Sequence, residues 1–246
     1  MEDKKIVAQS RAEVEKGVES LQQGNMDSAS NHFWNALDCL GDIQDERMRR
    51  DELGPLALYF LNLGLYDLAI MASSEAITLD KKLGEPRQLA EDIVTHGNAN
   101  MSLGNMDEAM KYYREALQLC LDNGDFDNAA SASTNMATLF AEQGNYQESI
   151  TLLRNSLDYV KKMPHPNTEK NTYLTLIQVL DLAKGDPNEL LDAAKKLLEK
   201  YAHEIPQEHL NAITPHIDRA VQQYLKVNAD VDPEKWKSEY LPQLYG

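Results

Sequence analysis

A chain of 246 residues is long enough to bury a sizeable hydrophobic core, either as one extended domain or as two small ones. Hydrophobic residues make up 42% of it, but no apolar run approaches the roughly 18 residues that a membrane span requires, so we expect no membrane insertion. The formal net charge of −16 disfavours nucleic acid and anionic lipid surfaces as partners.

The amino-terminal stretch MEDKKIVAQS is charged and lacks the apolar core of a secretory signal. The two cysteines, Cys39 and Cys120, lie far apart without metal-binding spacing, which is typical of free thiols in a reducing compartment. These features predict a cytoplasmic protein.

Five glycines recur along the chain at nearly constant spacing. The intervals are 40, 40, 40 and 41 residues, and the glycines are Gly24, Gly64, Gly104, Gly144 and Gly185. About 18 residues with helical periodicity precede each glycine, and a second helical segment follows it. The sequence therefore predicts five consecutive helix hairpins.

The turn chemistry of these hairpins agrees with the spacing. We expect each glycine to end the first helix in a left-handed conformation. The residue after it is then a good N-cap for the second helix, in the set Asn25, Asn105, Asn145 and Asp186. A glutamate three residues later predicts a capping box at Glu108, Glu148 and Glu189.

Small residues recur on one stripe of the second helices. One set is Ala29, Ala69, Ala109 and Ser149, and a second set, seven residues further, is Ala36, Ala76, Ala116 and Ser156. Larger residues lie between the two sets, at Phe33, Tyr113 and Leu153. Such a stripe indicates a close helix–helix contact, and because one hairpin cannot bury its own apolar face, the hairpins must stack.

Three segments depart from the repeat. Gly54 and Pro55 lie inside the first helix of the second hairpin, which we expect to kink or restart there. In the fifth hairpin the small positions become Gln178, Leu190 and Leu197, which predicts a looser hairpin. After it, an amphipathic segment predicts a terminal helix that covers the last apolar face, with a split at Pro215.

The arginines Arg47, Arg49 and Arg50 are interpreted as surface residues on an outer helix.

These features together resemble the tetratricopeptide repeat. The small first-helix position of that family is met by Gly17, Ala57, Gly97 and Ala137, and its aromatic after the turn by Tyr66 and Tyr146. The first-helix tryptophan and the terminal proline of the family are missing, and units of 40 residues are similar to the long repeats of kinesin light chains, Pins/LGN adaptors and Rap-type peptide receptors.

The resemblance implies an all-α, right-handed superhelical solenoid of about 11–12 helices. We expect a five-hairpin array over residues 4–203, a capping helix over 204–228 and a carboxy-terminal tail over 229–246.

In this family, ligands bind in a concave groove that the first helices line. Carried over by position, the groove residues are Val14, Val18, Leu58, Leu61, Val94, Asn98, Met101, Asn135 and Thr138. An acidic rim is formed by Glu15, Asp51, Glu91 and Glu142. Asn98 and Asn135 match asparagines that hydrogen-bond a ligand's main chain in long-repeat relatives. The alternative is that these asparagines and the acidic rim are merely solvated, and that Leu58 and Met101 are packing residues.

Chaperone-binding members of the family hold a terminal carboxylate with cations in this groove. Apart from Arg11, the corresponding positions carry no cation. We therefore predict that the protein does not bind the acidic tails of Hsp70 or Hsp90.

Catalysis finds little support in the sequence. The glycines are single where a phosphate-binding loop clusters them, and His203, His209 and His216 are not spaced as metal ligands on one helix face. His96 has no acid or nucleophile placed near it by the sequence. We predict no catalytic residue, no metal site and no cofactor.

The predicted function is that of a non-catalytic adaptor whose groove binds a peptide or helix of a partner protein, apolar with basic flanks. The alternative is a structural scaffold. Arrays would then self-associate into a homo-oligomer, or Trp236 and Tyr240 in the tail would plug the groove.

Overall fold

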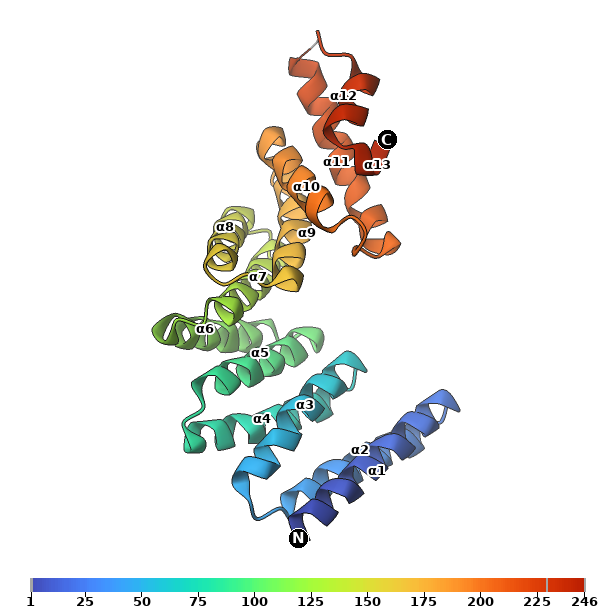
Figure 1. The fold of residues 1–246 in the computed structure, drawn as a ribbon, viewed down its shortest axis with the longest axis vertical. Coiled ribbons are helices and arrows are strands. Elements are labelled where there is room, and N and C mark those ends of the chain that lie inside the picture. The colour runs from blue at the N-terminus through green and yellow to red at the C-terminus, as the bar shows by residue number, and fades with distance from the viewer. Residues whose placement is uncertain (1, 229, 246) are drawn as a thin grey trace. The chain divides into compact units, whose positions relative to one another are not determined.

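The computed structural model describes residues 2–228 and 230–245, and the regular secondary structure in these residues is helical throughout. The chain divides into two compact units, Met1–Gly124 and Asp125–Gly246. Within each unit, successive helices lie side by side as antiparallel pairs (Figure 1). The predicted all-α class of repeated hairpins is confirmed, whereas the handedness of a superhelix stays a prediction.

The first unit contains three hairpins. Its helices are α1 (Glu2–Gln22), α2 (Met26–Gly41), α3 (Glu46–Asn62), α4 (Tyr66–Leu83), α5 (Pro86–Ser102) and α6 (Met106–Asn123). The core of this unit is formed by both helices of the hairpins, with Phe33, Leu53 and Phe60 fully buried.

The second unit contains two hairpins and three further helices. These are α7 (Phe126–Glu142), α8 (Tyr146–Lys162), α9 (Pro166–Leu182), α10 (Pro187–Tyr201), α11 (Gln207–Val227), α12 (Pro233–Tyr240) and α13 (Pro242–Tyr245). Thirteen helices are thus described, against the 11–12 predicted, because the tail carries two short ones. Residues 229 and 246, the ends of the predicted tail, lie outside the described residues, and the predicted domain limits stay a prediction.

The small residues of the repeat admit a neighbouring helix, as predicted. Both sets on the second helices are almost completely buried. The fit is tightest at Gly97, where an added Cβ would lie 2.7 Å from Cε1 of Tyr113, and at Gly17, where it would lie 2.4 Å from Cε1 of Phe33. A glycine in the first helix of the hairpin therefore makes room for an aromatic ring of the second helix.

Four of the five predicted turn glycines have the left-handed conformation, with φ between 74° and 82°. In the fifth hairpin, Lys184 has a φ of 50° and Gly185 does not have a positive φ, so the prediction for Gly185 is wrong. Lys184 lies 40 residues after Gly144, so the left-handed position keeps the interval of the repeat. The extra residue of this repeat, Gly185, follows it in the turn.

The caps of the second helices differ from the prediction in part. The side chains of Asn25 and Asp186 accept backbone N–H groups as N-caps, whereas those of Asn105 and Asn145 do not. The N–H groups of Asn105 and Asn145 donate to carbonyls of the preceding helix at 2.9 and 2.8 Å, so they are not free for the predicted capping boxes. The tight turn satisfies them instead. Of the box glutamates, Glu108 pairs with Lys111 and Glu189 with Arg154.

Neither internal proline interrupts its helix. α3 continues through Pro55 and α11 through Pro215, so the predicted restart and split do not occur. Buried residues flank both prolines, with Leu53 and Ala57 around the first and Ile213 and Ile217 around the second. Packing of the apolar face outweighs the local cost of the proline. No helix among the described residues is long and apolar enough to cross a membrane.

Candidate functional site

A hollow of about 430 Å³ opens between the first helices α1 and α3 of the first unit. It brings together three of the predicted groove and rim residues, Val14, Glu15 and Asp51. Apolar side chains, including Leu56 and Tyr59, line it together with these carboxylates. The hollow therefore combines apolar and acidic groups, the character that was predicted for the groove.

The cation at this hollow, Arg11, is already paired. Its Nε and Nη2 atoms donate to the two carboxylate oxygens of Glu52 at 3.1 and 2.6 Å. This hydrogen bonding raises the pKa of Arg11 above its ordinary value. A guanidinium held by a carboxylate in this way is a poor receptor for the terminal carboxylate of a peptide, because the two acids would compete for it.

The remaining predicted residues of the first unit do not line this hollow. Val18 and Leu61 are half-buried and pack against the core of the unit, and Val94 is half-buried on α5. Leu58 is exposed, with 49% of its surface accessible. On the rim, Glu91 is exposed beside Arg87, at 3.4 Å.

Asn98 and Met101 cover the buried ring of Tyr113. The hydroxyl of Tyr113 donates to Oδ1 of Asn98 at 2.6 Å and lies 3.7 Å from Sδ of Met101. Tyr113 is fully buried, and its hydroxyl needs an acceptor there. These contacts give both residues a role in the fold, in addition to the ligand contact predicted for them.

A second hollow, of about 300 Å³, lies among α7, α9 and α11 in the second unit. It contains the other two predicted groove residues, Asn135 and Thr138. Facing them are Asn171, Thr175 and Gln178 of α9, and the apolar side chains of Leu174 and Ile213 complete the lining. Glu142, the last residue of the predicted rim, is exposed at the end of α7.

The α9 residues of this hollow are not among the predicted ones, because the 41-residue glycine interval sets the first helix of the fifth hairpin one residue out of register. That interval puts Gln178 at the small buried position. In the structure that position, 40 residues after Ala137, is Ile177, which is fully buried, and Gln178 is half-buried in the hollow. With the correct interval, Thr175 and Gln178 are the equivalents of Asn135 and Thr138.

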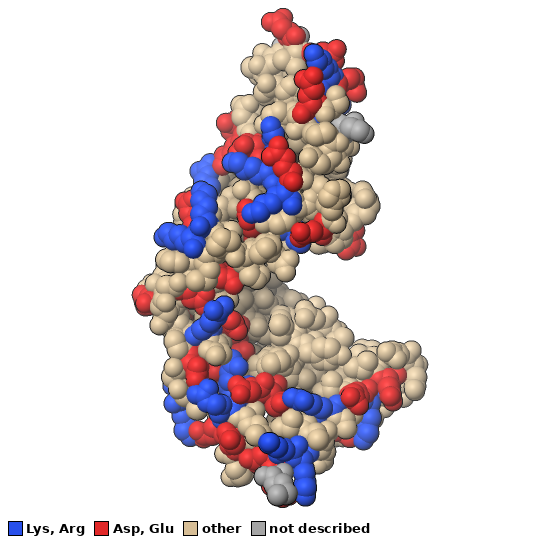
Figure 2. Space-filling view, in the orientation of Figure 1, with Lys and Arg blue, Asp and Glu red and all other residues tan. Residues whose placement is uncertain are grey.

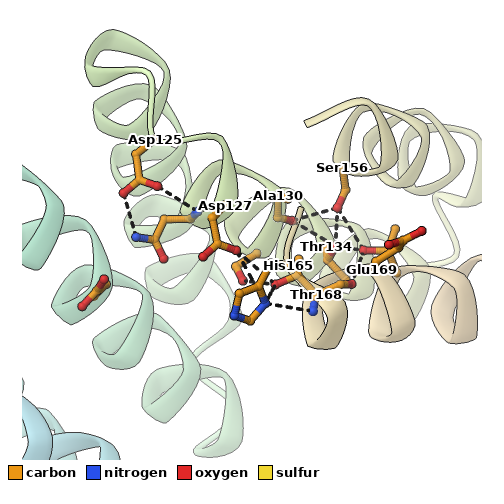
Figure 3. A network of polar contacts seen from close by, with 12 residues as sticks. Asp125, Asp127, Ala130, Thr134, Ser156, His165, Thr168 and Glu169 are labelled. Carbon is orange, nitrogen blue, oxygen red and sulfur yellow. Dashed lines mark hydrogen bonds and ion pairs between the residues drawn. The ribbon is translucent and has the colours of Figure 1, made fainter. Parts of the chain in front are cut away.

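A cluster of hydroxyl, imidazole and carboxylate groups joins the amino-terminal ends of α7 and α9 (Figure 3). The Thr168 hydroxyl lies 2.9 Å from Nδ1 of His165, and Asp127 approaches the same nitrogen at 3.6 Å. A base that activates a hydroxyl uses one ring nitrogen for the hydroxyl and the other for the acid. In this cluster the hydroxyl and the carboxylate approach the same nitrogen, Nδ1, so the arrangement differs from that of a catalytic base. Nδ1 also accepts the backbone N–H of Thr168 at 3.3 Å, and His165 is therefore the N-cap of α9.

Buried hydroxyls continue this network into the core of the second unit. Thr134 of α7, Ser156 of α8 and Thr172 of α9 lie within 2.9 to 3.0 Å of one another. Ser156 also donates to the carbonyl of Ala130 at 3.0 Å (Figure 3). The network holds three helices in register and leaves the hydroxyls satisfied.

A buried ion network joins α3, α4 and α5 in the first unit, and it corrects the interpretation of the arginines. Arg50 donates to Asp80 at 2.5 Å and to Asp92 at 3.1 Å, and both carboxylates are almost inaccessible. Arg49 forms a close ion pair with Glu75. Of the three arginines, only Arg47 is exposed, and it too is paired, with Glu85 at 2.5 Å.

Asp92 has the most perturbed acidity in this network. Burial, and the hydrogen bond to Asp80, raise the pKa of Asp92 to about 8, although Arg50 opposes the shift. A proton on Asp92 provides a donor for Asp80, whose Oδ2 is buried and has no other partner among the described residues. The site is a positively charged group between two carboxyls, and the raised pKa of Asp92 keeps a proton on Asp92 near neutral pH.

The tail packs on α10 and α11. Trp236 stacks on Tyr224 and on Tyr240, with ring centroids 4.9 and 4.6 Å apart, and Nζ of Lys195 lies 4.5 Å from the ring of Tyr240. Leu241 is fully buried in the core of the second unit. These contacts differ from the predicted plug, because they lie outside the first-helix positions of the groove.

Charged side chains of both signs are interleaved over the face of the first unit that Figure 2 draws. Many carboxylates of this unit are paired with cations of another helix, as in Glu52 with Arg11 and Glu46 with Lys82. The excess of acidic residues is thus dispersed on this face, and no extended surface of one sign is seen there.

The sequence profile of the tetratricopeptide repeat matches residues 93–162. None of the curated proteins compared with the chain matches it in sequence.

Several solved structures share the fold. The apo form of RapI has a TM-score of 0.66 and 17% identity over 91% of this chain and 66% of its own. The Rap conjugation gene regulator of the plasmid pLS20, in complex with the Phr* peptide, has a TM-score of 0.61 and 16% identity over 94% of this chain and 67% of its own. A putative kinesin light chain of Podospora anserina has a TM-score of 0.55 and 15% identity over 81% of this chain and 93% of its own.

At these identities the likeness concerns the fold, and the chain spans about two thirds of the length of the two Rap proteins. The sequence match to residues 93–162 and the repeated hairpins agree with it. Residues 93–162 thus match the tetratricopeptide repeat in sequence, and the chain shares the fold of tetratricopeptide repeat proteins.

Proposed function

We propose that the protein is an interaction module that binds an extended or helical segment of another protein on the first helices of its hairpins, without a catalytic step. Each unit has one of the hollows described above, and each hollow is a candidate site by itself. The repeat fold supports a protein-interaction scaffold, and a cytoplasmic location is part of the same proposal.

The observation that carries the proposal is the composition of the second-unit hollow. The amides of Asn135, Asn171 and Gln178 surround a space whose apolar lining includes Leu174 and Ile213. Amide groups can donate to and accept from a peptide backbone, and the apolar side chains can hold a partner's side chain. The pLS20 regulator, of the same fold, is solved with a peptide, which makes a peptide segment the reasonable ligand to test.

The chemistry of the partner follows from the first-unit hollow. Glu15 and Asp51 are exposed beside its apolar lining, and Arg11 is engaged by Glu52. An apolar segment with lysine or arginine at its flanks would complement this arrangement. The proposal also retains the other predicted ligand contacts, which are Asn98, Met101, Val18, Leu58, Leu61 and Val94.

The test begins with peptides of 15 residues selected from a displayed library for binding to the whole protein. Their dissociation constants are then measured by fluorescence anisotropy for the wild type and for Asn135→Ala/Asn171→Ala. Two lost hydrogen bonds of about 0.5–1.5 kcal/mol each weaken binding roughly 5- to 150-fold. Asn155→Ala, an exposed asparagine on α8, is the matched control and should change nothing.

Two results would contradict the proposal. One is a set of selected peptides that bind the double variant as tightly as the wild type. The other is an equal loss of affinity in Asn155→Ala, which would place the binding surface on the second helices.

A further inference from the structure

The second helices α2 and α4 of the first unit carry an exposed apolar surface. Trp34 and Met71 retain 51% and 40% of their accessible surface. Both side chains line two adjoining hollows, of about 350 and 220 Å³. Tyr66 and Leu103 line the larger hollow, and Leu37 and Ala72 the smaller one. We call this surface, defined by Trp34, Met71 and the two hollows, the Trp34 face.

The repeat itself shows that the scaffold does not require apolar residues at these positions. The residues that correspond to Trp34 at 40-residue intervals are Ser74, Arg114 and Arg154. Those that correspond to Met71 are Asn31, Lys111 and Thr151. All six are exposed. A tryptophan and a methionine in their place, on neighbouring helices and lining the same hollows, are typical of a contact surface.

The charges around the Trp34 face are acidic. Asp67 lines the larger hollow, and Asp38 lines the smaller one. α2 contains no lysine or arginine, and Glu75, which also lines the smaller hollow, is paired with Arg49. Two copies of this face would bring like charges together, whereas a basic segment would be attracted. The charge thus favours a different molecule over a second copy of this chain.

We propose that the Trp34 face is a second docking site, which binds a segment of a partner protein that carries apolar side chains flanked by lysine or arginine. One apolar side chain of the partner enters each hollow on either side of Trp34 and Met71. Basic flanks lie against Asp38 and Asp67. The site is distinct from the first-helix hollows, so the two sites can be tested separately.

Trp34 is its own reporter for the test. The chain has two tryptophans, and Trp236→Phe leaves Trp34 as the only one. The probe is a 14-residue peptide of leucine and lysine with its leucines on one helical face, and the comparison peptide has glutamate in place of every lysine. We expect the lysine peptide to shift Trp34 emission to shorter wavelength and the glutamate peptide to leave it unchanged.

The substitutions introduce residues that occupy the equivalent positions of another hairpin, so they are compatible with the fold. Met71→Lys and Trp34→Arg introduce the residues found at Lys111 and Arg114. Each should weaken binding of a labelled lysine peptide at least tenfold in anisotropy, with the helical circular dichroism unchanged. Leu182→Lys, at a position that is 52% exposed on α9, should bind like the wild type.

Three outcomes would overturn the proposal. The first is equal binding of the lysine and glutamate peptides, or full binding by folded Met71→Lys. The second is loss of binding in Asn135→Ala, which would place the peptide in the second-unit hollow. The third is a dimer in sedimentation velocity that Trp34→Arg dissociates while the peptide does not bind, which would make the face an interface between copies.

Discussion

At the scale of single residues, the contact between Gly97 and Tyr113 links the fold to the candidate site. The absence of a side chain at Gly97 lets the Tyr113 ring enter, and the hydroxyl at its far end reaches Asn98 and Met101. A change at Gly97 would thus displace residues of the proposed ligand-binding face without touching them directly.

We predict that Gly97→Ala lowers the free energy of unfolding by about 1–3 kcal/mol, as expected for overpacking of a core. The new Cβ would lie 2.7 Å from the Tyr113 ring. Gly41→Ala is the control, because apart from its chain neighbours and its own helix backbone nothing lies within 4 Å of a Cβ there, and it should be neutral or stabilising by up to about 1 kcal/mol. Urea denaturation of both variants checks the prediction, which fails if they are equally stable.

The carboxyl of Asp92 gives a prediction for pH. Its pKa in the folded protein is about 8, against an ordinary value of 3.8. Between these values Asp92 carries up to one more proton in the folded state than in the unfolded state, so the contribution of this group to stability is largest at low pH and falls as the pH rises towards 8. The slope due to this group is at most about 1.4 kcal/mol per pH unit.

Asp92→Asn should remove this dependence, because an amide resembles the protonated acid and does not titrate. We expect the difference in unfolding free energy between Asp92→Asn and wild type to shift in favour of the variant between pH 5.5 and 8.5. Denaturation at intermediate pH values measures this difference, in which the contributions of the other groups cancel. A difference that is constant with pH would mean that Asp92 is ionised throughout.

At the scale of helices and turns, the fifth hairpin shows what the left-handed position costs. Lys184 has a φ of 50°, where the other four turns have glycine. The left-handed conformation costs a residue with a side chain roughly 1–2 kcal/mol, and glycine regains part of this through its greater freedom in the unfolded chain. The turn of the fifth hairpin therefore has the least favourable backbone conformation of the five turns.

We predict that Lys184→Gly stabilises the protein by about 0.5–1 kcal/mol in thermal or urea denaturation. Ala183→Gly is the matched control next to it. Ala183 has an ordinary helical φ of −71°, so glycine there should destabilise by a similar amount. The assignment of strain to Lys184 is wrong if both glycine variants change stability in the same direction.

The hairpins could be predicted because their determinants are local in the sequence. A turn glycine and small residues at fixed offsets specify a hairpin without knowledge of its neighbours, and packing then carries α3 and α11 through their prolines. One extra residue sufficed to misplace the fifth hairpin. The glycine marks the turn, but the backbone places its left-handed residue at Lys184.

The candidate site could be predicted only in part, because it depends on contacts between helices. Arg50 meets Asp80 and Asp92 across 30 and 42 residues, and nothing in the run of arginines distinguishes it from its exposed neighbour Arg47. In the same way, the sequence placed Asn98 on a first helix but gave no sign that the Tyr113 hydroxyl binds it. Burial of a polar group is set by its partner, which the repeat pattern does not specify.

At the scale of the whole molecule, each compact unit has its own buried core. Leu53 belongs to the core of the first unit, and Leu241, from the tail, belongs to the core of the second. Each unit also contains one tryptophan, Trp34 in the first and Trp236 in the second. Arrays of repeats unfold as linked neighbours rather than as one body, so the cooperativity between the units is measurable.

We predict that core mutations act on their own unit. In a Trp34→Phe background, Leu241→Ala should lower the stability reported by Trp236 by about 2–5 kcal/mol, because a fully buried leucine is truncated. In a Trp236→Phe background, the transition reported by Trp34 should not move. Leu53→Ala should give the reverse pattern, with the Trp34 transition lowered and that of Trp236 unchanged. If both tryptophans report the same shift for either mutation, the two units unfold as one cooperative body, and the tail stabilises the whole chain rather than the second unit alone.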